Sequence, residues 1–147
     1  MPPKARLLSL FLISGLFLSA DRFLKWQSLN DWSAPRLLNR FFGWEPSLNY
    51  GVAFSIPLPN PLIIALTIPI ILIVVYLFAG EKKLAPKFAL LMIIFGALSN
   101  LFDRIFLGHI VDYLLILTAV INLADAMIAA GFLLYFLKIK NRSPKEA

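Results

Sequence analysis

The sequence has no cysteine and a single histidine, His109. The missing cysteines exclude thiol catalysis, disulfide bonds and thiolate metal sites, and the lone histidine excludes any site that needs two. Charged residues are also scarce: they make up 15% of the 147 residues, whereas apolar residues make up 60%. Soluble domains contain about 25% charged and 45–50% apolar residues. With a mean hydropathy of +0.81, residues 1–147 are expected to form a single integral membrane domain.

Four apolar stretches are expected to cross the membrane as helices. The stretch 61–79 has 19 residues without a charge, which is long enough for a hydrocarbon core of about 30 Å. The fold class predicted from this pattern is an all-α membrane protein with a four-transmembrane-helix bundle. The expected spans are residues 7–24, 61–79, 88–107 and 120–137.

Residues 26–56 are mixed in polarity and contain every tryptophan of the chain, namely Trp26, Trp32 and Trp44. Tryptophan collects at the boundary between water and lipid, because its ring is apolar and its N–H is polar. The second half of this stretch is rich in strand-forming residues around Gly51. We therefore expect a small extracytoplasmic platform, amphipathic or β-structured, over residues 26–56.

The basic residues are distributed unevenly about the expected spans. Four spans place both termini on one side, and nine of the 14 Lys and Arg residues fall on that side. Basic residues accumulate on the cytoplasmic side of membrane proteins, so both termini are expected to be cytoplasmic. The net charge of +6 is thereby explained by orientation, and no nucleic-acid partner is expected.

Acidic residues recur at one depth in the expected bundle. A helix rises about 1.5 Å per residue. Measured in this way from the basic residues at the cytoplasmic end of each span, Asp21, Asp103 and Asp125 lie in the outer third of the membrane. Asp112 joins them from the connection before the last span. A carboxylate at membrane depth is costly and is a functional-site hypothesis by default.

Two neighbouring carboxylates in a low-dielectric site tend to share one proton. One can then activate a water while the other polarises a carbonyl, as in aspartic proteases. We favour Asp112 and Asp125 as this pair, because Asp21 and Asp103 have basic neighbours in the sequence. These neighbours, Lys25 and Arg104, could hold the other two acids as ion pairs. The amides expected to bind substrate or the acids belong to Asn49, Asn100 and Asn122.

Other classes of function fit parts of the same pattern. His109 could join the nearby acids in a metal site, although the sequence has no HExxH pattern. A small proton- or ion-handling membrane protein would also place carboxylates in spans. In a purely structural bundle the polar residues would only hold the helices together.

Four motifs in the same order resemble the bacterial lipoprotein signal peptidases, signal peptidase II, over nearly the whole chain. The motifs are Asp21-x-x-x-Lys25, NYGVAFS over residues 49–55, Asn100-x-x-Asp103-Arg104 followed by Gly108, Val111 and Asp112, and Asn122-x-Ala124-Asp125. The resemblance implies an aspartic endopeptidase that removes signal peptides from bacterial prolipoproteins, cutting before a diacylglyceryl-modified cysteine.

The resemblance also implies the roles of individual residues. The catalytic pair maps onto Asp112 and Asp125, in agreement with the choice above. The supporting and substrate-binding residues would be Asp21, Lys25, Asn49, Gly51, Asn100, Asp103, Arg104 and Asn122. No metal or organic cofactor is implied. Expected partners are lipid-modified prolipoproteins, membrane lipids and cyclic-peptide antibiotics in the substrate groove, and the protein is expected to be a monomer in the bacterial cytoplasmic (inner) membrane, with its active site near the extracytoplasmic face.

The sequence departs from the family pattern at three places. Ser99 stands where glycine is usual, which is expected to loosen helix packing, and Tyr113 replaces the usual phenylalanine after Asp112. The connection from Asp112 to Asn122 is shorter than usual and lacks a Trp/Pro-x-Phe approach. If this connection forms a lid over the site, lid shape and substrate range are expected to differ.

Overall fold

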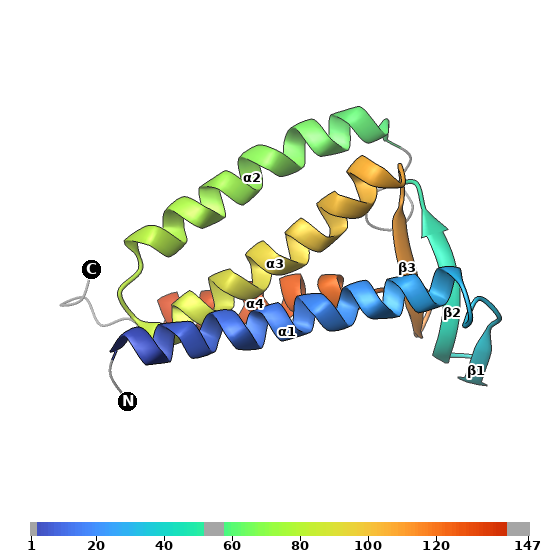
Figure 1. Ribbon diagram of the computed structural model, residues 1–147, viewed down its shortest axis with the longest axis horizontal. Coiled ribbons are helices and arrows are strands. Elements are labelled where there is room, and N and C mark those ends of the chain that lie inside the picture. Colours follow the sequence, from blue (N-terminus) through green and yellow to red (C-terminus); the bar gives the residue numbers. More distant parts are fainter. Residues whose placement is uncertain (1–2, 52–57, 141–147) are drawn as a thin grey trace.

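The computed structural model describes residues 3–51 and 58–140 of the chain. Within these residues the chain forms four helices, packed side by side, and a sheet at one end of them (Figure 1). The helices are α1 Pro3–Leu29, α2 Asn60–Gly80, α3 Leu84–Phe106 and α4 Leu123–Lys140. The strands are β1 Arg36–Asn39, β2 Phe42–Asn49, β3 Ile110–Ile116 and β4 Ala119–Ile121.

Three helices of the described chain, α1, α2 and α3, are long and apolar enough to cross a membrane. The fourth, α4, has 18 residues and carries Asp125, Lys138 and Lys140. The four expected helices are present, and each overlaps its predicted span. Helix α1 runs beyond the predicted 7–24 at both ends, and α4 starts at Leu123 rather than at residue 120.

The predicted fold is confirmed in part: the four helices are present, but the β-structure extends beyond the small platform, because four strands pair into an antiparallel sheet in the order β1-β2-β3-β4. Strands β1 and β2 lie inside the predicted platform 26–56, whereas residues 26–29 belong to α1 and residues 52–56 lie outside the described residues. Strands β3 and β4 were expected to be a link and the start of a span. The sequence of β3, IVDYLLI, is a short apolar run. The periodicity of such a run does not show whether it forms a buried strand or part of a helix.

Helix α3 is the central element and packs against α1, α2 and α4. Glycines allow α3 and α4 to approach closely: a Cβ at Gly96 would lie 2.6 Å from the carbonyl oxygen of Ala124, and one at Gly131 would lie 2.6 Å from that of Ala89. Small residues at such interfaces are typical of membrane helices. In α2, by contrast, only Ile63 and Ile71 are buried, so most of its surface is available to lipid.

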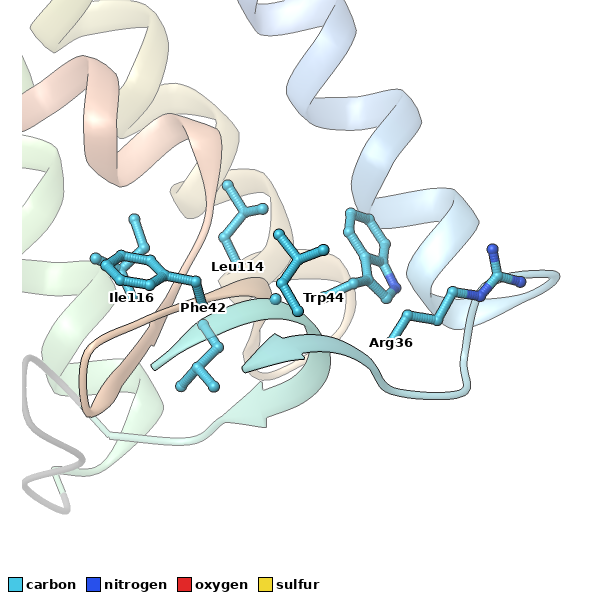
Figure 2. A pocket seen from close by; sticks show the side chains of 8 residues that line it. Arg36, Phe42, Trp44, Leu114 and Ile116 are labelled. Atoms are coloured by element: carbon cyan, nitrogen blue, oxygen red, sulfur yellow. The ribbon is translucent and has the colours of Figure 1, made fainter. Parts of the chain in front are cut away.

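Aromatic side chains join the sheet to the end of α1. The ring of Trp44 stacks on Tyr113 with centroids 4.9 Å apart and meets Trp32 edge-on at 5.6 Å. Figure 2 shows Trp44 pointing from the sheet towards α1. An apolar groove of about 410 Å³ runs along the sheet here, lined by Arg36, Leu38, Phe42, Gly43, Trp44, Leu114, Leu115 and Ile116.

Candidate active site

Asp112 lies in β3, is 2% exposed and accepts a hydrogen bond at each carboxylate oxygen. Its Oδ1 accepts from the side-chain amide of Asn122 at 2.6 Å. Its Oδ2 accepts from the side-chain amide of Asn49 at 3.1 Å. Asn49 reaches this position because β2 pairs with β3, with Ser47 opposite Asp112. The carboxylate is thus held between two strands and the start of α4.

Asp125 lies in the first turn of α4 and shares a reciprocal cap with Asn122. The backbone N–H of Asp125 donates to Asn122 Oδ1 at 2.8 Å, and the backbone N–H of Asn122 donates to Asp125 Oδ2 at 3.3 Å. This is the geometry of a capping box, which fixes the first turn of a helix. The other oxygen of Asp125 accepts from the amide of Asn100 at 2.7 Å.

Asn122 therefore contacts both carboxylates, and the structure brings Asp112 and Asp125 together around it. Burial, and next the charge of Asp125, raise the pKa of Asp112 to about 6, against the hydrogen bonds from Asn49 and Asn122, which lower it. Asp112 is consequently expected to keep its proton to a higher pH than an ordinary carboxylic acid does.

Lys25 is the centre of a second buried cluster beside this pair. Its Nζ lies 2.7 Å from Asp103 Oδ2 and 3.2 Å from Asp21 Oδ2, and it donates to Asn100 Oδ1 at 2.8 Å. The pairing with Asp21 is the one expected from their i, i+4 spacing. Since Asn100 also donates to Asp125, it connects the ionic cluster to the carboxylate pair.

The partners of Asp103 and Arg104 differ from the sequence expectation. In the described chain Asp103 pairs with Lys25 and with Arg22, a residue that sequence reasoning left out of the site. Arg104 instead donates to the backbone carbonyls of Tyr50, at 3.2 Å, and Gly51. Consecutive helical residues point about 100° apart, so Asp103 faces α1 while Arg104 faces the end of β2.

Gly51 follows Asn49, whose side-chain oxygen accepts the Gly51 N–H at 3.0 Å. Arg104 and Asn49 therefore hold this turn beside Asp112. The rest of the NYGVAFS motif, residues 52–55, lies outside the described residues.

The ring of His109 packs on Tyr50 with centroids 5.0 Å apart. In residues 3–51 and 58–140, no group of three potential ligands is placed to hold a metal ion.

Both side chains that depart from the family pattern donate hydroxyl hydrogen bonds to Asp21. Ser99 Oγ donates to Asp21 Oδ2 at 2.6 Å, and Tyr113 OH donates to Oδ1 at 2.9 Å. Sequence reasoning assigned neither residue to the site. Ser99 lies one residue before Asn100 and Tyr113 one residue after Asp112, so proximity to the motifs was the available signal.

Membrane-length helices, and two carboxylates that both bond to Asn122 at the sheet end of the bundle, form the arrangement expected of a membrane protein of the aspartic-peptidase class. Residues 13–140 match the family model of signal peptidase (SPase) II. The chain belongs to the signal peptidase II family, which confirms the resemblance drawn from its motifs.

Similar proteins cover between 56% and 100% of the chain. A lipoprotein signal peptidase of Ectopseudomonas mendocina (strain ymp) is 31% identical over 167 residues, covering 100% of this chain and 99% of the relative. One of Bartonella tribocorum is 34% identical over 143 residues, covering 88% and 86% of the two chains. One of Brucella ovis is 39% identical over 92 residues, covering 56% and 58%.

Two solved structures of a bacterial membrane enzyme, obtained by the in meso method at 2.3 and 1.9 Å resolution, share the fold. The first has a TM-score of 0.84 at 21% identity and covers 95% of this chain and 94% of that one. The second has a TM-score of 0.80 at 21% identity and covers 92% and 94%. At this identity the likeness describes the fold alone.

Proposed function

We propose that this chain is a lipoprotein signal peptidase in which Asp112 and Asp125 are the catalytic pair. It would cleave prolipoproteins on the N-terminal side of the diacylglyceryl-modified cysteine. The observation that carries the assignment is the position of Asn122, which hydrogen-bonds to both carboxylates. Family membership supplies the reaction, and this geometry supports the choice of Asp112 and Asp125.

The reaction needs one protonated and one ionised acid. Asp112, with its pKa raised to about 6 by burial and by the charge of Asp125, holds the proton and donates it to the oxygen of the scissile carbonyl. Asp125, at the N-terminal end of a helix dipole, removes a proton from water. The water oxygen then bonds to the carbonyl carbon. As the C–N bond breaks, the amine takes the proton held by Asp125, and a hydroxyl of the intermediate returns its proton to Asp112 while the C=O bond forms again.

The remaining predicted residues have supporting roles in this proposal. Asn100 aligns Asp125 and links it to Lys25, which neutralises the buried acids Asp21 and Asp103. Arg104 and Asn49 hold the turn at Gly51, where the backbone of an extended substrate could lie beside Asp112.

We further infer that α1, α2, α3 and α4 all cross the bacterial cytoplasmic (inner) membrane as one integral domain. Helix α1 starts, and α4 ends, at the end of the bundle remote from the sheet (Figure 1). Those ends carry basic residues, Lys4 and Arg6 on α1, and Lys138 and Lys140 on α4. Both termini would be cytoplasmic, and the carboxylate pair would lie just below the extracytoplasmic surface.

This placement suits a substrate anchored by its own lipid, which arrives sideways within the bilayer. Only the scissile bond must then meet water. We also propose that the monomer is active. Cyclic-peptide antibiotics would compete with the substrate for its place beside Asp112.

The test is cleavage of a lipid-modified prolipoprotein by the purified protein, followed as a gel shift. Asp112→Asn and Asp125→Asn should each abolish the shift while thermal unfolding in detergent stays cooperative. Asp31→Asn, at an exposed acid after α1, is the matched control and should cleave normally. Turnover retained in either site variant contradicts the assignment. Proton flux in liposomes without cleavage would favour an ion-handling protein.

A further inference from the structure

Asp21 is a fully buried carboxylate on which four parts of the fold converge. It is on α1 and accepts from Ser99 of α3 at 2.6 Å, Tyr113 of β3 at 2.9 Å and the backbone N–H of Ala124 in α4 at 3.0 Å. Lys25 balances its charge. A single side chain is therefore in contact with the elements that carry both members of the carboxylate pair.

Tyr113 is the most informative of these contacts. It follows Asp112 in β3, and successive strand residues point to opposite faces, so its ring lies on the other side of the strand. The ring is fully buried and stacked on Trp44. Its hydroxyl donates to Asp21 and at the same time accepts the backbone N–H of Leu123 at 3.0 Å.

Leu123 begins α4, two residues before Asp125. The N–H groups of a first helical turn have no partner within the helix, and here Leu123, Ala124 and Asp125 each donate to a side chain, those of Tyr113, Asp21 and Asn122 respectively. The hydrogen bonds that fix this first turn therefore also set the orientation of Asp125.

We propose that Tyr113 is a positioning residue of the peptidase, whose hydroxyl fixes the strand of Asp112 against the first turn of the helix of Asp125. Ser99 assists by holding the other oxygen of Asp21. This inference rests on the proposed function, because it takes Asp112 and Asp125 as the reacting acids. Neither hydroxyl touches substrate in this role.

Tyr113→Phe removes the hydroxyl and keeps the stacked ring, so the strand remains packed while the Leu123 N–H loses its acceptor. Misplacement of a reacting group lowers the rate more than it lowers binding, and kcat should fall by about tenfold or more. KM should stay within about twofold of the wild-type value, since the turn at Gly51 proposed to lie along the substrate, held by Asn49 and Arg104, is unchanged. Ser99→Ala should lower kcat in the same direction by a smaller factor.

The two hydroxyls act through one carboxylate, so their effects should not be independent. The double variant should lose less than the product of the two single losses. Leu90→Ala is the control for lost stability: Leu90 is buried in α3, nine residues from Ser99, and its removal should lower the unfolding temperature without changing kcat.

Folded Tyr113→Phe protein with wild-type kcat overturns the inference, whatever its unfolding temperature. Should Tyr113→Phe fail to fold, Ser99→Ala decides in its place: a lowered kcat at unchanged KM supports the inference, and an unchanged kcat overturns it. Cleavage by Asp112→Asn or Asp125→Asn would instead contradict the assignment of the catalytic pair. Failure of the positioning role of Tyr113 can therefore be distinguished from failure of that assignment.

Discussion

Asn122 donates its side-chain amide to Asp112 across the β3–β4 hairpin, at 2.6 Å from the acceptor oxygen. The same residue ends that hairpin and caps α4, since its side-chain oxygen accepts the N–H of Asp125. One asparagine therefore performs two separable tasks, with its nitrogen facing one acid and its oxygen facing the backbone of the other.

Substitution of Asn122 can separate these tasks. Asn122→Ser keeps an oxygen that can cap the helix but removes the donor to Asp112, so kcat should fall by about tenfold or more at a nearly normal unfolding temperature. Asn122→Ala removes both, and should in addition lose about 1 kcal/mol of stability. Cleavage assays and thermal unfolding measure the two effects. Equal kcat in the serine variant and the wild type would contradict this role of the amide.

The raised pKa of Asp112 predicts the pH dependence of cleavage. Burial and the charge of Asp125 raise this pKa to about 6, so the shared proton is present below that pH and is lost as the pH rises through it. The kcat/KM profile should therefore fall on its alkaline side with a midpoint near that pKa.

Asn49 provides a variant that should move this alkaline limb. Its hydrogen bond to Asp112 favours the ionised carboxylate and lowers the pKa. Asn49→Ala should raise the pKa further and shift the alkaline limb of kcat/KM to higher pH. A shift to lower pH, or none, would mean that Asp112 does not hold the required proton.

Two glycines of the α3–α4 interface, Gly96 and Gly131, allow a comparison of two equally close packing contacts. A Cβ at Gly96 would meet the carbonyl oxygen of Ala124, and one at Gly131 would meet that of Ala89, both at 2.6 Å. Each alanine variant should therefore lose about 1–3 kcal/mol of stability through overpacking. Gly96→Ala should also lower kcat, because Ala124 precedes Asp125, whereas Gly131→Ala should keep it. Equal activity losses would show that overpacking acts through global destabilisation.

The buried ionic cluster predicts unequal effects for its two basic residues. The side chain of Lys25 is 1% exposed and that of Arg22 is 31% exposed. Lys25→Met leaves buried acids without their main counter-charge and should cost about 3–5 kcal/mol. Arg22→Met removes a partly solvated pair and should cost about 1 kcal/mol. Thermal unfolding in detergent measures both. The double variant Lys25→Met/Asp103→Asn should recover part of the loss.

The sequence was sufficient to predict the helices and the neighbourhood of the polar residues. Long uncharged runs such as 61–79 have no alternative to a membrane helix, and motif order assigns Asp112 and Asp125 to the same site. Helical spacing predicts that Asn100, Asp103 and Arg104 share one face. Asn100 and Asp103 both contact Lys25, whereas Arg104 contacts the turn at Gly51.

The spacing of residues along one helix does not show which residues of other elements they contact. This explains the contacts that the sequence did not predict. Arg22 meets Asp103, 81 residues away, and Tyr113 meets Asp21, 92 residues away. Strands β3 and β4 were missed for a related reason, because the pairing of β3 with β2 and of β4 with β3 depends on contacts that a short apolar run does not encode. Such contacts are set by the tertiary fold.

The first turn of α4 is capped by Tyr113, Asp21 and its own Asn122. Asp21 belongs to the first of the described helices, and α4 is the last of them to be synthesised. The proposed catalytic pair therefore gains its full set of hydrogen-bond partners only after α4 has been synthesised and has packed against α1.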